Sequence, residues 1–322
     1  MLPPREHITI GFAHVAYNGR DRLLRRHLGL RALEARTQEE LEAILPEVDV
    51  LCISGMWRND IPARAPRLRF VQSMSSGTDQ FDREVLRAAG IRLASAAGVN
   101  AEAVAEHAIA LLLALYRRLP EARDNQARRH WRGMISDFAE REDELRGKTL
   151  LVVGMGRIGA RLIALARAFG MRVIGVRANP AAGSAGADEV HPTSALLDLL
   201  PRADALVLVC PLTAETTGLI GAQALAAMPR HAVLVNCARG RVCDQAALIE
   251  ALAARRIRGA ALDVFAEEPL PTDSPLWAMP HVLITPHTAG ETCVYEDNVI
   301  DILLENLERL WRGEQELVNG VV

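Results

Sequence analysis

Short apolar runs alternate with segments of helical period over the first hundred residues. The alternating segments are residues 8–12, 21–28, 48–54, 70–74, 85–89 and 91–94. Strand–helix alternation of this kind predicts a mainly parallel sheet covered by helices. We therefore expect the chain to begin with an α/β domain.

Two longer helical segments follow. In residues 101–118 the apolar side chains nearly surround the helix, and a second helix is predicted over residues 121–131. A helix that is apolar on every side must be buried, within the domain or between subunits.

A second alternating series begins after the polar segment 140–147. Six strands separated by helices are the inventory of a doubly wound dinucleotide-binding domain. The predicted strands are residues 150–153, 172–176, 205–209, 232–235, 259–263 and 282–285, and the intervening helices are residues 158–169, 194–200, 223–228 and 245–254. A last helix, residues 294–311, is long enough to cross back to the first domain.

The composition points to small-molecule chemistry. The chain has 322 residues, half of them hydrophobic, and its net charge of −3 is spread without the basic stripe that nucleic-acid and anionic-membrane binding require. The longest apolar run, residues 108–116, is too short for a membrane span, and the N-terminus lacks the apolar core of a signal peptide. We therefore expect a soluble cytoplasmic protein.

Cysteine and lysine usage narrows the chemistry further. Five scattered cysteines without a Cys-x-x-Cys pair predict reduced thiols and no metal site. Lys148 is the only lysine among 37 basic residues, and its charged surroundings do not suit a Schiff base. The tripeptide Gly147-Lys148-Thr149 looks like the end of a phosphate-binding loop, but Glu142 stands where that loop needs a glycine.

A glycine fingerprint marks the first strand of the second series. The sequence after residues 150–153 is G-x-G-x-x-G, with Gly154 for the tight turn, Gly156 for close approach of a pyrophosphate and Gly159 for helix–strand packing. Since a strand precedes it and a helix follows it, the fingerprint predicts dinucleotide binding and not merely a structural turn.

The cofactor preference depends on Arg177. It ends the second strand of this series, where NAD sites carry an acidic residue that binds the ribose hydroxyls. An arginine there can pair with the 2′-phosphate of NADP(H) instead. NADP(H) is therefore favoured and NAD(H) possible, the alternative being that Arg177 is one more solvent-exposed arginine.

Downstream motifs resemble the D-isomer-specific 2-hydroxyacid dehydrogenases. The three signature blocks are at residues 236–244, 261–270 and 285–290. Further matches are Val104-Ala-Glu-His107, Trp131, residues 210–216 and Ser75-Ser-Gly-Thr-Asp79. The resemblance spans most of residues 70–312.

The resemblance implies a catalytic set that reduction of a 2-oxo acid would need. Arg239 would bind the carboxylate and carbonyl of the substrate, and His287 would act as the acid/base. Glu268 would orient the imidazole and favour its protonated form. The alternatives are that His287 is an ordinary loop histidine and that Glu267 is the partner, but Glu268 directly precedes proline, as in the family pattern.

The resemblance also implies contacts with cofactor and substrate. Asp263 would bind the nicotinamide carboxamide, unless it only caps a turn. The backbone N–H groups of Ser76 and Gly77 would hold the substrate carboxylate together with Arg239. The family more often has Gly-Ala-Gly at residues 75–77. The other expected cofactor contacts are Val104, Arg157, Ile158, Cys210, Pro211, Thr216 and Ala238.

We therefore expect two Rossmann-like parallel-sheet domains, one flavodoxin-like and one doubly wound, with a catalytic cleft between them. Residues 1–99 and 291–322 would bind substrate, and residues 100–290 would bind the cofactor. The resemblance implies a homodimer formed through the 101–118 region.

The expected function is hydride transfer between a nicotinamide cofactor and a 2-oxo acid such as glyoxylate or hydroxypyruvate. Formate dehydrogenase is disfavoured because Glu268 stands where that relative has glutamine. Phosphoglycerate dehydrogenases with regulatory domains are disfavoured because nothing follows Val322. The alternative is a nucleotide-sensing scaffold similar to the corepressors called C-terminal binding proteins.

Overall fold

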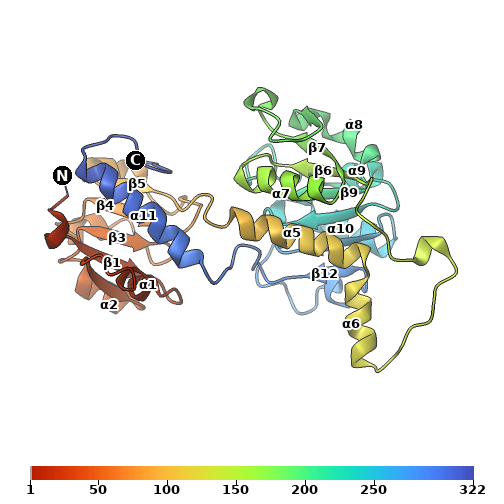
Figure 1. Cartoon of the computed structure of the whole chain (residues 1–322), viewed down its shortest axis with the longest axis horizontal. Helices are drawn as coiled ribbons and strands as arrows, with labels where there is room; N and C mark the ends of the chain where they lie inside the picture. Colours follow the sequence, from red (N-terminus) through yellow and green to blue (C-terminus); the bar gives the residue numbers. More distant parts are fainter. Residues whose placement is uncertain (1) are drawn as a thin grey trace. The chain divides into compact units, whose positions relative to one another are not determined.

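Two parallel sheets organise the chain, one in each of two units (Figure 1). The structure is a computed structural model that describes residues 2–322, apart from the side chain of Ala139. Unit 1 runs to Asn100 and resumes over Thr292–Val322, and unit 2 is Ala101–Glu291. Each boundary lies one residue beyond the expected one. Met1, with which the expected first domain begins, lies outside the described residues.

Unit 1 contains a five-stranded sheet in the order β2-β1-β3-β4-β5. All four neighbouring pairs are parallel. This is the flavodoxin-like order, as expected. The strands are β1 (Thr9–Ala13), β2 (Arg31–Ala35), β3 (Val50–Ile53), β4 (Phe70–Ser73) and β5 (Arg92–Ala94).

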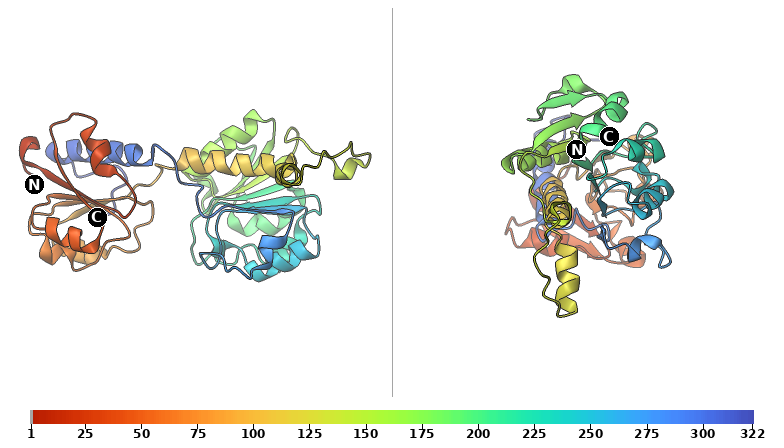
Figure 2. Two further views of the ribbon diagram at one scale, coloured as in Figure 1. Left: turned by 90° about the horizontal axis from the view of Figure 1, so that it is seen from below. Right: turned by 90° about the vertical axis from the view of Figure 1, so that its right-hand side faces the viewer.

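Helices cover both faces of this sheet (Figure 2). On one face, Leu23 of α1 and Leu303 of α11 pack against apolar strand residues. On the other face, α2, α3 and α4 contribute Leu41, Ile61 and Leu86. The helices are α1 (Gly19–Leu24), α2 (Gln38–Ile44), α3 (Ile61–Arg64), α4 (Arg83–Ala88) and α11 (Tyr295–Trp311).

The residues after α11 extend the sheet beside β5. Gly320 forms an antiparallel bridge with Ala94. The Val321 N–H donates to the Leu93 carbonyl at 2.7 Å, and the Leu93 N–H donates to the Val322 carbonyl at 3.1 Å. The edge of β5 is therefore paired with the C-terminal segment.

Unit 2 contains a seven-stranded parallel sheet in the order β12-β11-β10-β9-β6-β7-β8. Counted from β6, this is the doubly wound order expected for a dinucleotide-binding domain, so the predicted fold class is confirmed. The strands are β6 (Thr149–Val153), β7 (Arg172–Val176), β8 (Glu189–His191), β9 (Ala205–Leu208), β10 (Val233–Asn236), β11 (Gly259–Leu262) and β12 (Val282–Ile284).

The helices of unit 2 form a layer on each face of the sheet. One apolar cluster contains α5 and α7, and another contains α8, α9 and α10. The helices are α5 (Ala101–Tyr116), α6 (Leu119–Ala127), α7 (Arg157–Ala168), α8 (Leu196–Leu199), α9 (Ala222–Ala227) and α10 (Gln245–Ala253). No helix in the described part of the chain is long and apolar enough to cross a membrane.

The apolar helix α5 is buried within unit 2. Seven of its 16 residues, including Leu112 and Tyr116, lie in the core that α5 shares with α7 and the sheet. It ends at Tyr116, two residues before the predicted end, and Arg118 adopts a left-handed φ of 52° before α6 begins. The packing of α5 against its own unit accounts for its apolar character.

Four short strands and α-helices, β2, β8, α2 and α3, were not predicted from the sequence. The strands β2 and β8 lie at sheet edges, where most of their residues are only partly buried, so no apolar run marks them. Helix α2 begins with a capping box between Thr37 and Glu40, a spacing that would have predicted it.

Candidate active site

The glycine turn between β6 and α7 is set by close packing. Gly154 has a φ of 104°, and a Cβ there would lie 2.6 Å from the Cys210 backbone nitrogen. A Cβ on Gly159 would lie 2.0 Å from the Gly154 carbonyl oxygen. Both positions exclude a side chain because strand, helix and the loop after β9 meet through backbone atoms.

Gly156 is different, since the fold leaves space beside it. No atom lies within 4 Å of a Cβ built on Gly156, the N-cap residue of α7. Arg157, Ile158 and Gly159 form the first turn of this 12-residue helix, whose positive dipole end attracts phosphate. An open backbone surface at a helix N-terminus fits a pyrophosphate, so the residues present fit a dinucleotide cofactor.

Arg177 follows β7, at the same edge of the sheet. Its backbone N–H donates to the His191 carbonyl at 3.1 Å. Its Nη1 donates to the carbonyls of Ala182 at 3.2 Å and Gly183 at 3.0 Å. The guanidinium therefore lies against the loop beyond β7, and with five N–H groups it keeps donors for a ligand.

Arg239 lies in the turn after β10. The buried Asn236 side chain accepts the Ala238 N–H at 3.0 Å and donates to the Arg239 carbonyl at 3.2 Å, which fixes the turn. Arg239 is exposed, and its Nη1 donates to the Ala238 carbonyl at 2.7 Å. The turn therefore presents a cation at the carboxyl end of a strand, where α/β sheets bind ligands.

The segment after β11 packs on this turn and carries Glu268. A Cβ on Gly240 would lie 1.8 Å from the Phe265 carbonyl carbon, so the two segments meet without a side chain between them. The Phe265 N–H donates to Glu268 Oε1 at 2.9 Å. Glu268 Oε2 lies 2.7 Å from Nδ1 of His287, which brings the expected carboxylate and imidazole together.

His287 and Arg239 both affect the pKa of the Glu268 carboxyl. Burial acts to raise the pKa of its carboxyl, but hydrogen bonds from His287 and the Phe265 N–H, with the charges of His287 and Arg239, bring that pKa below its ordinary value. An ionised carboxylate only accepts hydrogen bonds, so His287 Nδ1 donates. Nε2 is then the ring nitrogen that can exchange a proton with a ligand. Glu267, the competing carboxylate, is exposed.

Asp263 holds the loop that contains His287. Its buried carboxylate accepts the Thr285 hydroxyl at 2.6 Å and the N–H groups of Thr288 at 3.0 Å and Ala289 at 3.1 Å. Its backbone carbonyl accepts the His287 N–H at 2.8 Å. The expected contact of Asp263 with a nicotinamide carboxamide stays a prediction beside this observed role.

The other expected cofactor residues border the glycine turn or lie in the core. Thr216 Oγ1 donates to the Pro211 carbonyl at 2.7 Å, which closes the loop that begins at Cys210. Val104 and Ala238 are each 4% exposed. Their contacts with a cofactor stay predictions.

The expected carboxylate-binding turn lies in unit 1, after β4. Ser75 Oγ donates to the Gly77 carbonyl at 2.8 Å, and Ser76 Oγ donates to the Ala96 carbonyl at 3.4 Å. The side chain of Ser75 therefore forms a hydrogen bond within the turn, and that of Ser76 forms one with the segment after β5. Glycine and alanine have no hydroxyl group and could form neither bond. Binding of a carboxylate by Ser76 and Gly77 stays a prediction.

Sequence reasoning assigned no role to Asn236, Thr285 or His107. Asn236 ends β10, Thr285 directly follows β12, and His107 Nε2 lies 3.1 Å from Thr285 Oγ1. Short polar residues at the ends of buried strands often bond to nearby backbone, and that signal would have found the first two.

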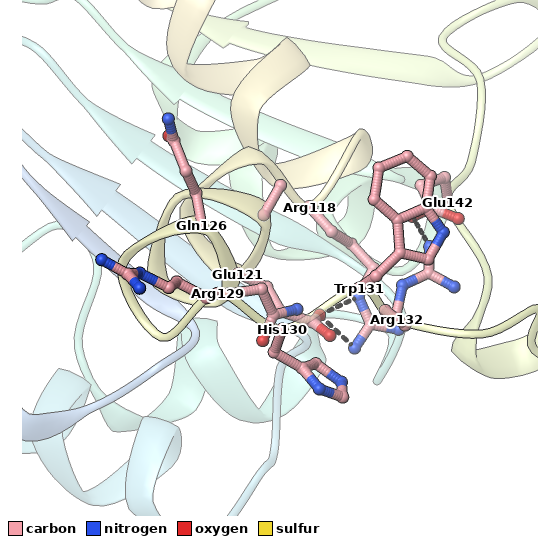
Figure 3. Close-up of a pocket in the computed structure, with 10 residues that line it drawn as sticks. Arg118, Glu121, Gln126, Arg129, His130, Trp131, Arg132 and Glu142 are labelled. Carbon is pink, nitrogen blue, oxygen red and sulfur yellow. Dashed lines mark hydrogen bonds and ion pairs between the residues drawn. The ribbon is translucent and has the colours of Figure 1, made fainter.

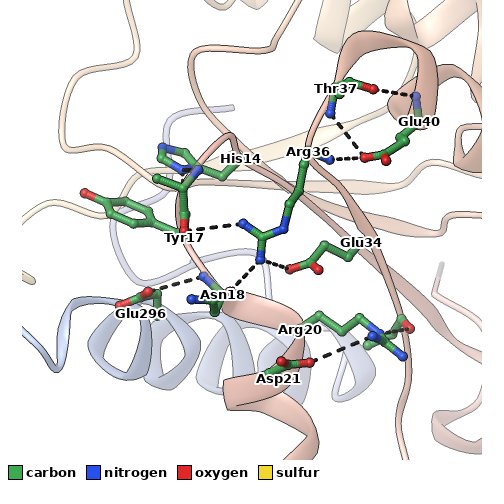
Figure 4. A network of polar contacts seen from close by, with 12 residues as sticks. His14, Tyr17, Asn18, Arg20, Asp21, Glu34, Arg36, Thr37, Glu40 and Glu296 are labelled. Carbon is green, nitrogen blue, oxygen red and sulfur yellow. Dashed lines mark hydrogen bonds and ion pairs between the residues drawn. The ribbon is translucent and has the colours of Figure 1, made fainter.

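Two surface hollows lie away from these residues. In unit 2, a cavity of about 500 Å³ near α6 is lined by residues that include Arg118, His130 and Trp131 (Figure 3). In unit 1, a cavity of about 350 Å³ lies along β2, next to a polar network centred on Arg36 (Figure 4). Neither cavity is lined by a residue that the sequence assigns to the site.

Together, fold and site define a two-domain α/β protein whose second unit is a Rossmann-type dinucleotide-binding domain. Residues 109–289 match the family model described as the NAD-binding domain of D-isomer specific 2-hydroxyacid dehydrogenase. The chain belongs to this family, and the resemblance seen in its sequence motifs is confirmed.

Relatives support the assignment over most of the chain. Glyoxylate reductase of Aeropyrum pernix is 40% identical over 276 residues, which cover 82% of this chain and 80% of that one. Glyoxylate/hydroxypyruvate reductase B of Pectobacterium carotovorum is 34% identical, with coverage of 90% and 91%. A solved D-isomer specific 2-hydroxyacid dehydrogenase from Xanthobacter autotrophicus, in complex with NADPH and MES, is 29% identical and covers 98% of both chains with a TM-score of 0.79.

The chain spans about half the length of the D-3-phosphoglycerate dehydrogenases it matches. That of Methanocaldococcus jannaschii is 36% identical over 281 residues, which cover 86% of this chain and 52% of that protein.

Proposed function

We propose that the chain is an NAD(P)-dependent D-2-hydroxyacid dehydrogenase that interconverts a small 2-oxo acid and its D-2-hydroxy acid. The observation that carries the proposal is the 2.7 Å contact between His287 Nδ1 and Glu268 Oε2, on the same unit as the glycine turn. A nicotinamide cofactor, when bound, supplies or accepts the hydride.

The three side chains have complementary tasks in reduction. The planar fork of Arg239 binds the substrate carboxylate and draws the carbonyl oxygen into register. His287 Nε2 gives its proton to that oxygen as the carbonyl carbon is reduced. Glu268 stabilises the imidazolium before transfer and keeps the ring oriented. In the oxidation direction, His287 takes the hydroxyl proton instead.

A turnover assay tests the activity. The purified chain is mixed with glyoxylate, hydroxypyruvate, pyruvate, 3-phosphohydroxypyruvate or bulkier 2-oxo acids, each with NADPH and with NADH. We expect oxidation of the reduced cofactor with at least one acid. Cofactor binding without turnover of any of them would contradict the enzyme proposal and favour a nucleotide-sensing scaffold.

Replacement of the imidazole tests its role. We expect His287→Ala to lower kcat by about 10²- to 10⁴-fold, the usual contribution of a general acid, while the dissociation constant for NADPH stays nearly unchanged. Retained activity in this variant would show that the acid/base lies elsewhere.

Glyoxylate and hydroxypyruvate are the proposed substrates. Two relatives that match most of this chain are named glyoxylate reductase and glyoxylate/hydroxypyruvate reductase B. The N–H groups of Ser76 and Gly77 are proposed to hold the substrate carboxylate with Arg239. Preference for 3-phosphohydroxypyruvate in the panel would instead place the chain with the phosphoglycerate dehydrogenases.

NADPH is the proposed cofactor. Arg177 follows β7, where a cation can pair with a 2′-phosphate, and the solved relative from Xanthobacter holds NADPH. We expect Arg177→Asp to shift the ratio of kcat/KM values towards NADH. Arg172→Ala, at the other end of the same strand, is the control and should leave the ratio unchanged. An unchanged ratio in Arg177→Asp would contradict the preference.

A homodimer is also proposed, formed through the 101–118 region together with the segment after α6. In that segment Trp131, Met134 and Phe138 are 83% exposed or more, and on α5 seven of the 16 residues are buried in their own unit, which leaves the others for a partner. Exposed large apolar side chains within eight residues of the sequence are typical of an interaction surface. Light scattering should give twice the mass of one chain. The double variant Trp131→Ser, Met134→Ser should have the mass of a single chain.

A further inference from the structure

His107 is a partly buried histidine for which the proposed reaction has no task. It lies on α5, and its side chain is 23% exposed. Its Nε2 is 3.1 Å from Thr285 Oγ1 and 3.6 Å from Asp263 Oδ1. It therefore meets the loop that carries His287 from a helix remote in sequence.

The two hydrogen bonds that link His107, Thr285 and Asp263 have a fixed donor-to-acceptor direction. The Thr285 hydroxyl has one hydrogen and donates it to Asp263 Oδ1 at 2.6 Å. Its oxygen can then only accept from His107, so His107 carries a proton on Nε2. The result is a directed chain from His107 through Thr285 to Asp263.

This chain ends on the carboxylate that fixes the turn of His287. Asp263 accepts the N–H groups of Thr288 and Ala289 and, through its backbone carbonyl, that of His287. His287 itself has a φ of 55°, in the left-handed region that non-glycine residues rarely adopt. Such a conformation persists only where surrounding contacts over-determine it, and the Asp263 contacts do so.

A second feature makes the Asp263 carboxylate depend on His107. The carboxylate is buried, and its hydrogen-bond donors are the Thr285 hydroxyl and backbone N–H groups, all uncharged, with His107 Nε2 3.6 Å from Oδ1. A buried carboxylate that only uncharged donors satisfy loses more when one of them is removed. Without the His107 donor, the Thr285 hydroxyl could turn away from the Asp263 carboxylate. The hydrogen bonds of that carboxylate with the N–H groups of Thr288 and Ala289 would then loosen.

We propose that His107 is a positioning residue for the acid/base. Through the Thr285 hydroxyl it holds the Asp263 carboxylate, and Asp263 holds the 287–289 turn so that the imidazole keeps its contact with Glu268. This inference rests on the proposed function, because it assigns to His287 the reacting proton.

Paired substitutions at both links of the chain test it. His107→Leu and Thr285→Val remove the hydrogen bond, whereas His107→Gln and Thr285→Ser keep a donor or hydroxyl at the same place. We expect the first pair to lower kcat by about tenfold, the effect of one buried hydrogen bond, with the NADPH dissociation constant within about twofold of the wild type. The second pair should recover most of the rate.

Hydrogen exchange gives a readout that needs no turnover. Amide protons of the peptide over residues 285–290 should exchange faster in His107→Leu than in the wild type, and at the wild-type rate in His107→Gln. A wild type without turnover on any acid would defeat the proposed function, while this measurement still tests the chain of hydrogen bonds.

Two results would overturn the positioning role. One is an unchanged kcat in both His107→Leu and Thr285→Val. The other is an equal loss in His107→Gln and His107→Leu, which would show that the ring matters through its shape and not through its donor. If His107→Leu fails to fold, Thr285→Val against Thr285→Ser decides alone.

Discussion

At the scale of single residues, the charge on Glu268 bears more on the proposed chemistry than on stability. The pKa of the Glu268 carboxyl is lower in the folded protein than in the unfolded chain. Ionisation of the carboxyl therefore stabilises the fold at a pH above the pKa of the unfolded chain. This stabilisation is lost as the pH falls through the pKa of the folded protein. The Glu268 side chain is 35% exposed, so solvent screens much of the interaction. The direct effect is on the imidazole it faces.

The pair makes a clear prediction for pH dependence. Glu268→Gln replaces an anion with a neutral amide, which no longer favours the imidazolium over the imidazole. Since reduction consumes the imidazolium proton, the alkaline limb of the kcat/KM profile should move to lower pH. We expect kcat/KM at neutral pH to fall by about tenfold or more.

The neighbouring residue supplies a matched control. Glu267→Gln removes the same charge from an exposed position, and its pH profile should overlay that of the wild type. A shift of equal size in both variants would mean that the overall charge of the loop acts on His287 and that the direct contact does not.

Sequence motifs pointed to the proposed catalytic side chains but not to the residues that hold them. Arg239, Glu268 and His287 belong to motifs with fixed spacing, and the structure brings the last two within 2.7 Å. His107 and Thr285 are separated by 178 positions, and their contact exists only because α5 lies beside the end of β12. Hydrogen bonds of this kind depend on packing, which no local pattern encodes.

At the scale of elements, Gly159 and Gly156 in the turn between β6 and α7 are needed for different reasons. Gly159→Ala would place a Cβ 2.0 Å from the Gly154 carbonyl oxygen, so the helix must shift away from the strand. We expect a loss of about 1–3 kcal/mol in the free energy of unfolding, the usual cost of overpacking, measured by urea denaturation.

Gly156→Ala should behave in the opposite way. No atom lies within 4 Å of the added Cβ and the φ of −78° is ordinary, so the free energy of unfolding should change by less than about 1 kcal/mol. The dissociation constant for NADPH, measured by fluorescence titration, should rise because the methyl group occupies the space that a pyrophosphate needs. Unchanged binding would show that the phosphates lie elsewhere.

Most strands with a buried face could be predicted from the sequence, but the edge strands β2 and β8 could not, whereas the edge strand β12 was marked by its apolar run. The central strands β3, β6 and β9 are buried except for Thr149 at the start of β6, so their apolar runs stand out. The edge strand β8 has three partly buried residues, and β2 has one buried residue among five. Partial burial removes the contrast between apolar and polar positions on which strand prediction depends.

At the scale of the whole molecule, the two cores determine which thiols can react. Burial raises the pKa of Cys210 to about 11 and, as the largest of several causes, that of Cys243 to about 12, and it also raises the pKa values of Cys52 and Cys237. Cys293 is exposed. Because the thiolate is the reactive form, only Cys293 should react quickly.

Thiol counting with a chromogenic disulfide reagent at mildly alkaline pH checks this expectation. One thiol per native chain should react within minutes, and all five after denaturation. Cys293→Ser should leave no fast thiol. A fast-reacting thiol in that variant would mean that one of the cores opens on this timescale.

The division of unit 1 between both ends of the chain has a consequence for the order of folding. Residues up to Asn100 leave the ribosome before unit 2, but α11, which covers one face of their sheet together with α1, is made after unit 2. Until then, side chains such as Ile10, Phe12 and Phe70 lack the part of their cover that α11 supplies and are open to aggregation or to chaperones. Unit 2 is one continuous segment and can close its own core earlier. The unit that is synthesised first is therefore the unit whose core is completed last.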